Sequence, residues 1–106
     1  MFMAARTAPP AARSLAEIDL DAVAEALRTL AHPLRLRIVD LLMRKRHSVG
    51  DLAETLGEPQ AVVSQHLAQL RARGVLDVHR EGRSAFYFVI HPAAENVIRC
   101  IRKHAV

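Results

Sequence analysis

A cluster of short polar and small side chains lies between residues 59 and 73, at a spacing that places it on one face of a helix. Val63, Leu67 and Leu70 recur at i, i+4 and i+7, which predicts a helix from about Pro59 to Arg73 with these three buried. The opposite face would carry Gln60, Ala61, Ser64, Gln65 and Ala68. Glutamine can pair with an adenine edge through two hydrogen bonds, serine can meet several base edges, and alanine can pack against a thymine methyl group. A face exposed only to solvent would more often be rich in Lys and Glu, and this one has neither.

Four arginines, at the end of this segment and after it, could contact phosphate groups. Arg71 and Arg73 stand at the end of the predicted helix, and are better placed for the DNA backbone than for base edges. Arg80 and Arg83 belong to a charged turn at residues 80–84, which could lie against phosphate or enter the adjacent minor groove. A charged turn often serves solubility alone. Arg80 and Arg83 are nevertheless candidates for DNA contacts, because they follow the predicted helix closely in the chain.

A helix-turn-helix motif would hold the polar helix outward. Residues 48–56 form a short amphipathic segment that ends at Gly57. Ala53 is small enough to let two helices cross closely, Gly57 can adopt a positive φ, and Val63 can fill the angle between the helices. The alternative is an ordinary helix pair in a bundle, and the basic hairpin that follows disfavours it.

The remaining elements predict a mainly α-helical domain with a β-hairpin wing. Ser14 and Glu17 have the spacing of a helix-capping pair, and Pro33 suits the first turn of a helix. The predicted elements are helices from Ser14 to about Ala31, from Pro33 onward, at 48–56 and at 59–73, strands at 75–80 and 85–90, and a last helix from Pro92. The order α-α-α-α-β-β-α is that of a winged helix-turn-helix.

Length and composition indicate one small domain with a polyanionic partner. Residues 1–13 are rich in Ala and Pro without an apolar period, so we expect a flexible tail followed by one domain for DNA binding and dimerisation at 14–106. About half of the residues are apolar and none is tryptophan, and burying further apolar surface in a dimer would add stability to so small a core. A net charge of +4 and a pI near 10.2 favour nucleic acid or an anionic membrane surface as the partner.

Other function classes fit the sequence poorly. A Gly-rich phosphate loop, a His-Glu metal motif and a nucleophile beside a base are all missing, so we expect no enzyme activity. No apolar run approaches the ~20 residues that span a bilayer and none resembles a signal peptide, which predicts a cytoplasmic protein. The last helix has a short apolar stripe without large aromatic anchors, which disfavours a membrane partner.

Three segments together resemble the ArsR/SmtB family of winged-helix transcriptional repressors: HPLRLRIVDLL, SVGDLAETLG and VVSQHLAQLRARGVLDVHREGRSAFYFV. The resemblance covers about residues 20–104. It implies a homodimer joined through the first and last helices, a palindromic double-stranded DNA operator, and release when an inducer binds. By position, Gln60, Ala61, Ser64 and Gln65 match the base-reading face of the family, and Arg80 and Arg83 match its wing.

The inducer sites best known in this family are not intact in this sequence. Its third helix has no cysteine pair, its last helix lacks the full set of carboxylates and histidines, and Cys100 is the one cysteine of the chain. Cys100 and His104 are one helical turn apart and could bind one transition-metal ion, with two copies supplying a Cys2His2 set across a dimer. Two Cys100 thiols could instead form an intersubunit disulfide, or the thiol could be structural. We expect no organic cofactor.

Two alternative functions of the chain remain open. Without an intact inducer site, the chain could be a constitutive DNA-binding repressor, or a winged-helix module used for protein interaction. The resemblance implies a structural role for His32, which precedes Pro33 at a helix junction. The histidines at His47, His66 and His79 form no ligand-like spacing with each other and are expected at the surface or in packing.

Overall fold

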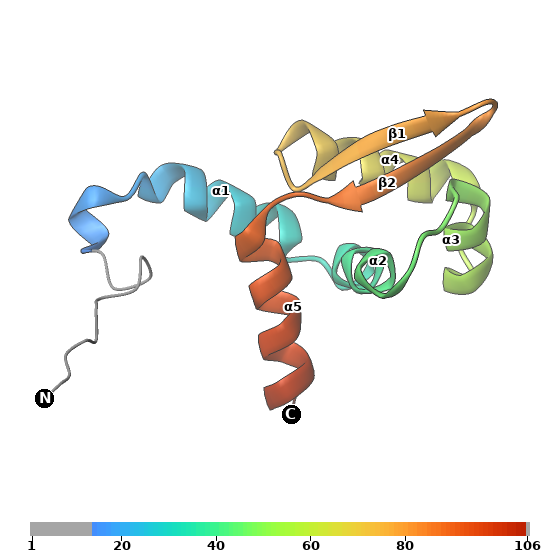
Figure 1. Cartoon of the computed structure of the whole chain (residues 1–106). Coiled ribbons are helices and arrows are strands. Elements are labelled where there is room, and N and C mark those ends of the chain that lie inside the picture. Colours follow the sequence, from blue (N-terminus) through green and yellow to red (C-terminus); the bar gives the residue numbers. More distant parts are fainter. Residues whose placement is uncertain (1–13, 106) are drawn as a thin grey trace, which may run out of the picture.

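The computed structural model describes residues 14–105, and these residues form five α-helices and one two-stranded hairpin (Figure 1). The tail expected at residues 1–13 lies outside the described residues. The elements are a 3-10 turn at Leu15–Glu17, α1 at Leu20–Leu30, α2 at Pro33–Arg44, α3 at Val49–Leu56, α4 at Gln60–Ala72, β1 at Leu76–Glu81, β2 at Ser84–Val89 and α5 at Pro92–His104. This order confirms the predicted winged helix-turn-helix.

The prediction of one continuous helix from Ser14 to Ala31 is wrong. Ser14 caps only the 3-10 turn, with its hydroxyl oxygen accepting a hydrogen bond from the Ala16 amide at 3.2 Å. Ile18 is extended, and the Asp19 carboxylate caps the true helix by accepting from the Ala22 amide at 3.1 Å. The sequence offers two N-cap residues five positions apart, and the second of them starts α1.

Local signals place the starts of α2 and α3 as predicted. Pro33 occupies the first turn of α2, and the His32 ring nitrogen Nδ1 accepts from the Leu34 amide at 3.1 Å. Ser48 and Asp51 form a complete capping box at α3, in which each side chain accepts from the backbone amide of the other.

A left-handed glycine makes the turn of the helix-turn-helix motif. Gly57 has a φ of 68°, and its amide donates to carbonyl oxygens near the end of α3. A side chain at this φ would be strained, so glycine is the residue that lets the chain reverse before Gln60 starts α4.

The hairpin pairs β1 with β2 in an antiparallel register that runs from Leu76 opposite Val89 to Glu81 opposite Ser84. Gly82, with a φ of 59°, is the first of the two turn residues. An isolated bridge joins Ser48 to Phe86, so the start of α3 lies against the outer edge of β2.

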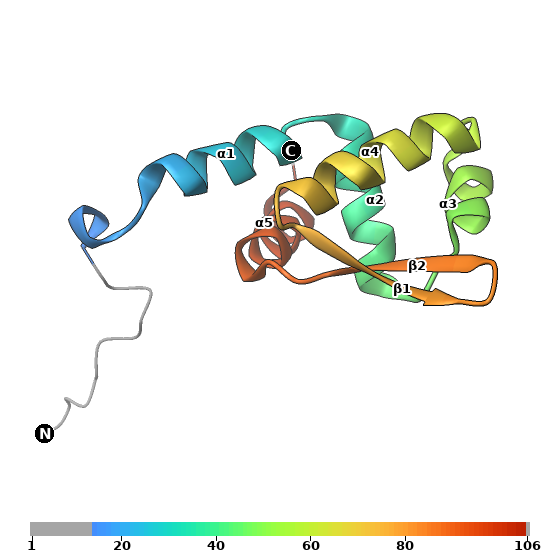
Figure 2. The same ribbon diagram turned by 90° about the horizontal axis from the view of Figure 1, so that it is seen from above.

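The hydrophobic core lies where α2, α3, α4 and the start of β1 meet. Its most completely buried side chains are Ile38, Val39, Leu52, Val63, Leu67, Leu70, Val75 and Leu76. Figure 2 shows α4 passing beside the hairpin base with α2 beneath both elements. Because α4 contributes three of these side chains, its inner face is fixed against the domain.

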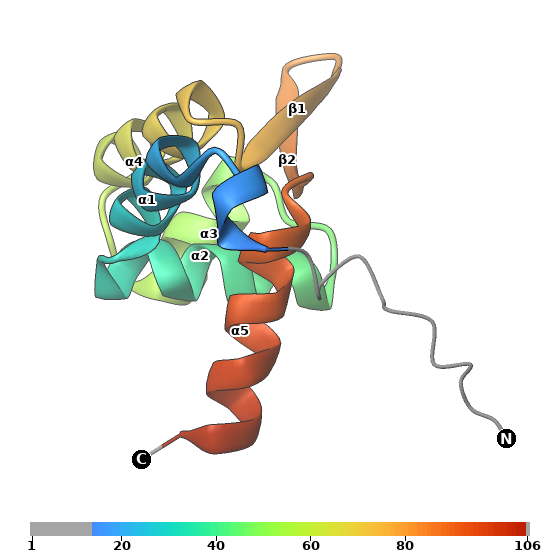
Figure 3. The ribbon, with the colours of Figure 1, turned by 90° about the vertical axis from the view of Figure 1, so that its left-hand side faces the viewer.

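Helices α1 and α5 are only partly covered by this core. α1 extends from one side of the domain and α5 projects below it, as Figure 3 shows from that side. Large apolar side chains remain exposed on both: Leu20, Val23 and Leu27 on α1, and Ile101 on α5. Among residues 14–105, no helix is both long enough and apolar enough to cross a membrane.

Candidate nucleic-acid interface

The outer face of α4 carries the side chains that the sequence predicted there. Val63, Leu67 and Leu70 are fully buried, and this anchors the helix. All five residues predicted on the opposite face are exposed: Gln60, Ala61, Ser64, Gln65 and Ala68. The helix therefore presents amide, hydroxyl and methyl groups from a rigid support, and their role in reading bases remains a prediction.

The first turn of α4 lies next to the first turn of α3. The Gln60 amide oxygen is 4.0 Å from the position that a Cβ atom on Gly50 would take. This closeness brings the N-terminal ends of both helices of the motif to one edge of the domain, where their free amide groups favour negative charge.

Two of the predicted phosphate contacts are engaged within the chain. Arg71 Nε lies 3.6 Å from the Asp77 carboxylate on β1, and Arg73 Nε lies 3.4 Å from the Glu25 carboxylate on α1. Each arginine side chain is about half exposed. A hydrogen bond from Arg28 and the charge of Arg73 lower the pKa of Glu25 below its ordinary value. These pairs join the end of α4 to its neighbours, so Arg71 and Arg73 would have to exchange partners to contact phosphate.

The other two predicted arginines lie at the tip of the hairpin. Arg80 is near the end of β1 and Arg83 is in the turn, and both are exposed. Within the described part of the chain, neither forms an ion pair. Their guanidinium groups thus project from the hairpin with their charge unneutralised, beside the motif that presents α4.

A polar contact behind α4, which sequence reasoning missed, joins it to α2 and α1. Arg35 donates from Nε to His66 Nδ1 at 3.0 Å and from a terminal nitrogen to the Thr29 carbonyl at 3.0 Å. Burial lowers the pKa of His66, and the neighbouring His32 and Arg35 lower it further. His66 therefore stays a neutral acceptor near pH 7, and the expectation that it serves packing fits this position. The two residues are 31 positions apart, and no local pattern links them.

A second missed contact joins α2 to α5. Arg102 donates from Nε to the Asp40 carboxylate at 2.8 Å, and Arg44 donates to the same carboxylate at 3.2 Å. Burial raises the pKa of Asp40, but the hydrogen bonds from Arg102 and Arg44 outweigh it, and the pKa lies below its ordinary value. This carboxylate thus links α2 to the outer half of α5.

The residues singled out for sensing lie on the outer part of α5. Cys100 and His104 are both exposed. Within residues 14–105 of one chain, no three His, Cys, Asp or Glu side chains come close enough to bind one metal ion. One chain supplies two ligands of the predicted Cys2His2 set, so that set remains a prediction about a dimer.

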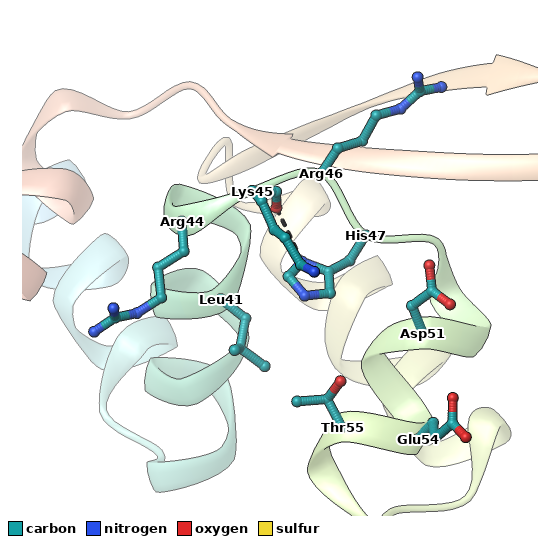
Figure 4. A pocket seen from close by; sticks show the side chains of 8 residues that line it. All are labelled: Leu41, Arg44, Lys45, Arg46, His47, Asp51, Glu54 and Thr55. Carbon is teal, nitrogen blue, oxygen red and sulfur yellow. Dashed lines mark hydrogen bonds between the residues drawn. The ribbon is translucent and has the colours of Figure 1, made fainter.

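A hollow of about 530 Å³ opens between α2 and α3, as Figure 4 shows. Its lining carries both signs of charge and consists of Leu41, Arg44, Lys45, Arg46, His47, Asp51, Glu54 and Thr55. The buried His47 ring is held by the Lys45 carbonyl at 2.9 Å. The Arg46 side chain points out of the hollow toward the hairpin (Figure 4).

Taken together, an anchored helix with an outward polar face, a tight glycine turn and an adjacent basic hairpin define a winged helix-turn-helix protein of the DNA-binding class. A family described as a helix-turn-helix domain matches residues 30–79. The transcriptional repressor PagR of Bacillus anthracis is 38% identical over 85 residues, which cover 79% of this chain and 85% of PagR. The repressor SmtB of Mycobacterium tuberculosis is 46% identical over 68 residues, 64% of this chain and 50% of SmtB.

Solved structures agree with these matches. The chain is similar to Mb0332 of Mycobacterium bovis, described as a homodimeric winged helix-turn-helix DNA-binding domain and a possible ArsR-family regulator, with a TM-score of 0.71 and 27% identity. That match covers 92% of this chain and 88% of the Mb0332 fragment. The protein belongs to the ArsR/SmtB family of winged-helix transcriptional repressors.

Proposed function

We propose that the protein represses transcription as a homodimer that binds a palindromic operator, with α4 of each protomer in the major groove and each hairpin against the flanking backbone. The observation that carries this proposal is the outer face of α4, which is exposed, free of Lys and Glu, and fixed from behind by three buried side chains. A helix of this kind fits the major groove, where amide and hydroxyl groups distinguish base pairs. We propose that the protein acts in the cytoplasm, because the proposed ligand is DNA.

The apolar faces of α1 and α5 support the dimer. Leu20, Leu27 and Ile101 are between 44% and 49% exposed in one chain, which leaves apolar surface open to solvent on two helices. Burial of apolar surface stabilises association by about 25 cal/mol per Å². Covering these residues with their copies in a second chain would bury them and set two α4 helices at a fixed spacing, as a palindromic site requires.

A binding titration with DNA from upstream of the protein's own gene tests the proposal. We expect sequence-preferring binding that weakens steeply as salt rises, because phosphate contacts release counterions. Gln65→Ala should reduce the preference for the operator over scrambled DNA by about 1–3 kcal/mol if its contact is bidentate. Gln69→Ala makes the same change one turn later, outside the predicted set, and should leave the preference intact. Absence of binding to any DNA at low salt would refute the proposal.

The wing residues should behave differently from α4. Arg83→Gln removes a phosphate contact, so we expect weaker binding to operator and scrambled DNA alike and a salt slope reduced by about one. A change in base preference, with affinity for scrambled DNA unchanged, would instead place Arg83 against the bases.

Cys100 and His104 are the residues we propose for signal-dependent release, because both project from the helix that we place at the dimer interface. Cys100→Ser should abolish release of operator DNA by a transition-metal ion if the thiol is a metal ligand, or by peroxide or persulfide if it is oxidised. Unchanged release under all three treatments would remove both roles. Absence of release even from the unmodified protein would identify a constitutive repressor.

A further inference from the structure

An arginine outside the predicted DNA-binding set holds the hairpin from the side. Arg46 lies in the connection between α2 and α3, and the centre of its guanidinium group is 3.6 Å from the centroid of the Phe86 ring on β2. The same guanidinium forms an ion pair with Glu81, the last residue of β1. One side chain thus contacts both strands of the hairpin near its tip.

The strand register explains why Arg46 meets these two residues together. Directly paired residues share a face of an antiparallel hairpin, and the face alternates along each strand. His79 pairs with Phe86, and Glu81 pairs with Ser84, so Glu81, His79 and Phe86 lie on one face. Arg80 lies on the opposite face. Arg46 therefore touches the hairpin without covering Arg80, one of the two hairpin arginines predicted to contact DNA.

The backbone beside Arg46 is itself attached to the hairpin. Ser48, two residues later, forms the bridge to Phe86 and also caps α3. The connection from α2 to α3 therefore joins the helix-turn-helix motif and the hairpin at two neighbouring points, one through the backbone and one through the Arg46 side chain.

Glu81 carries a negative charge next to the part of the hairpin that we propose to contact DNA, and this charge needs an explanation. It adjoins the turn that carries Arg83, where a carboxylate would repel phosphate. Arg46 lowers the pKa of Glu81 below its ordinary value, chiefly through their hydrogen bond, so Glu81 is ionised at neutral pH. His79 is a second partner, with its Nε2 atom 3.2 Å from the carboxylate.

We propose that Arg46, Glu81 and Phe86 form a wing clamp that sets the angle of the hairpin relative to α4. Arg46 is a positioning residue in this proposal, which rests on the DNA-binding function proposed above. With the clamp closed, the arginines at the tip meet the backbone while α4 lies in the groove. Glu81 acts as the anchor for Arg46, and its repulsion of phosphate is the smaller effect.

Glu81→Gln distinguishes a positioning role of Glu81 from a purely electrostatic one, because the two roles predict changes in DNA affinity of opposite sign. Removing an anion raises the net charge by one and frees Arg46, so electrostatics alone predicts tighter DNA binding. The wing clamp predicts weaker binding, by about three- to tenfold, since an exposed ion pair and a cation–π contact are each modest. Equal or tighter binding of the Glu81→Gln protein to operator DNA would overturn the proposal.

Arg46 variants provide the matched comparison. Arg46→Gln should weaken operator binding more than Lys45→Gln, which removes the same charge one position away. The double variant Arg46→Gln/Glu81→Gln should bind no more weakly than Arg46→Gln alone, because the clamp is already open. Additive losses would show that Arg46 and Glu81 act separately, and would count against the clamp.

Hydrogen exchange in the free protein tests the clamp without DNA. Amides of residues 80–85 should exchange faster in Glu81→Gln and Arg46→Gln than in Lys45→Gln, while amides of α4 keep their protection and so report an intact fold. Unchanged exchange at 80–85 refutes the clamp even if the protein binds its operator. Faster exchange there, in a protein that binds no DNA, supports the clamp and rejects the proposed function.

Discussion

Leu27 on α1 provides a quantitative test of the proposed dimer. The residue is 47% exposed in one chain, so a second chain could bury about half of its side chain. Leu27→Ala removes three carbon atoms, which are worth about 2.4 kcal/mol when their burial is complete and about half of that here. A two-fold axis repeats the loss in each protomer, which gives about 2.4 kcal/mol per dimer and a dimer Kd raised roughly 50-fold.

Sedimentation equilibrium over a range of protein concentrations measures this Kd. Thr55→Ala, an exposed change on α3, is the control and should leave the Kd as it is. Operator binding by the Leu27→Ala protein should weaken at low concentration and recover at high concentration, since its α4 is unaltered. A folded Leu27→Ala protein with an unchanged dimer Kd would show that α1 does not form the interface.

Three further predictions concern the fold. Gly50→Ala should stabilise the protein by about 0.5 kcal/mol, because the new Cβ makes only ordinary contacts, at 3.9 and 4.0 Å, and alanine restricts the unfolded chain. Leu67→Ala should cost about 2–5 kcal/mol in denaturant unfolding, since the side chain is fully buried. The depressed pKa of Asp40 should add stability that is present above its ordinary value of 3.8 and is lost as pH falls through the lower folded value.

The outcomes that contradict these three are equally specific. Loss of stability in Gly50→Ala would mean that the Gln60 side chain cannot accommodate the methyl group. A cost below about 1 kcal/mol for Leu67→Ala would mean that α4 is not anchored as described. For Asp40, the acid unfolding curve of Asp40→Asn is the comparison, and an equally steep loss of stability below pH 4 in that variant would assign the effect to other carboxylates.

Residue types with strong local preferences made most of the fold predictable from the sequence. Pro33, the Ser48 capping box and Gly57 each fix the backbone over a few residues, and the structure confirms all three boundaries. The inward face of α4 followed from helical spacing alone, because three apolar residues at that spacing leave the helix one way to pack. At the start of α1 the prediction from Ser14 was wrong, because the Asp19 carboxylate, five residues later, caps that helix.

The contacts that position the candidate site could not be predicted, because they join residues far apart in the chain. Asp40 and Arg102 are 62 positions apart, and their pairing depends on how α5 crosses α2. Arg71 and Arg73 were expected at phosphates, but their carboxylate partners on β1 and α1 are visible only once the elements are packed. Residue type identified these arginines as important, and tertiary structure determines what each one meets.

If the half-covered helix α1 forms the dimer interface, the degree of repression depends steeply on the concentration of the protein. If operator occupancy requires two subunits, and if the subunits separate at low abundance, occupancy grows with the square of the subunit concentration. Halving the amount of protein would then cut repression by more than half. By promoting dimerisation, the apolar stripe at Leu20, Val23 and Leu27 would make repression change more steeply than the concentration of the protein.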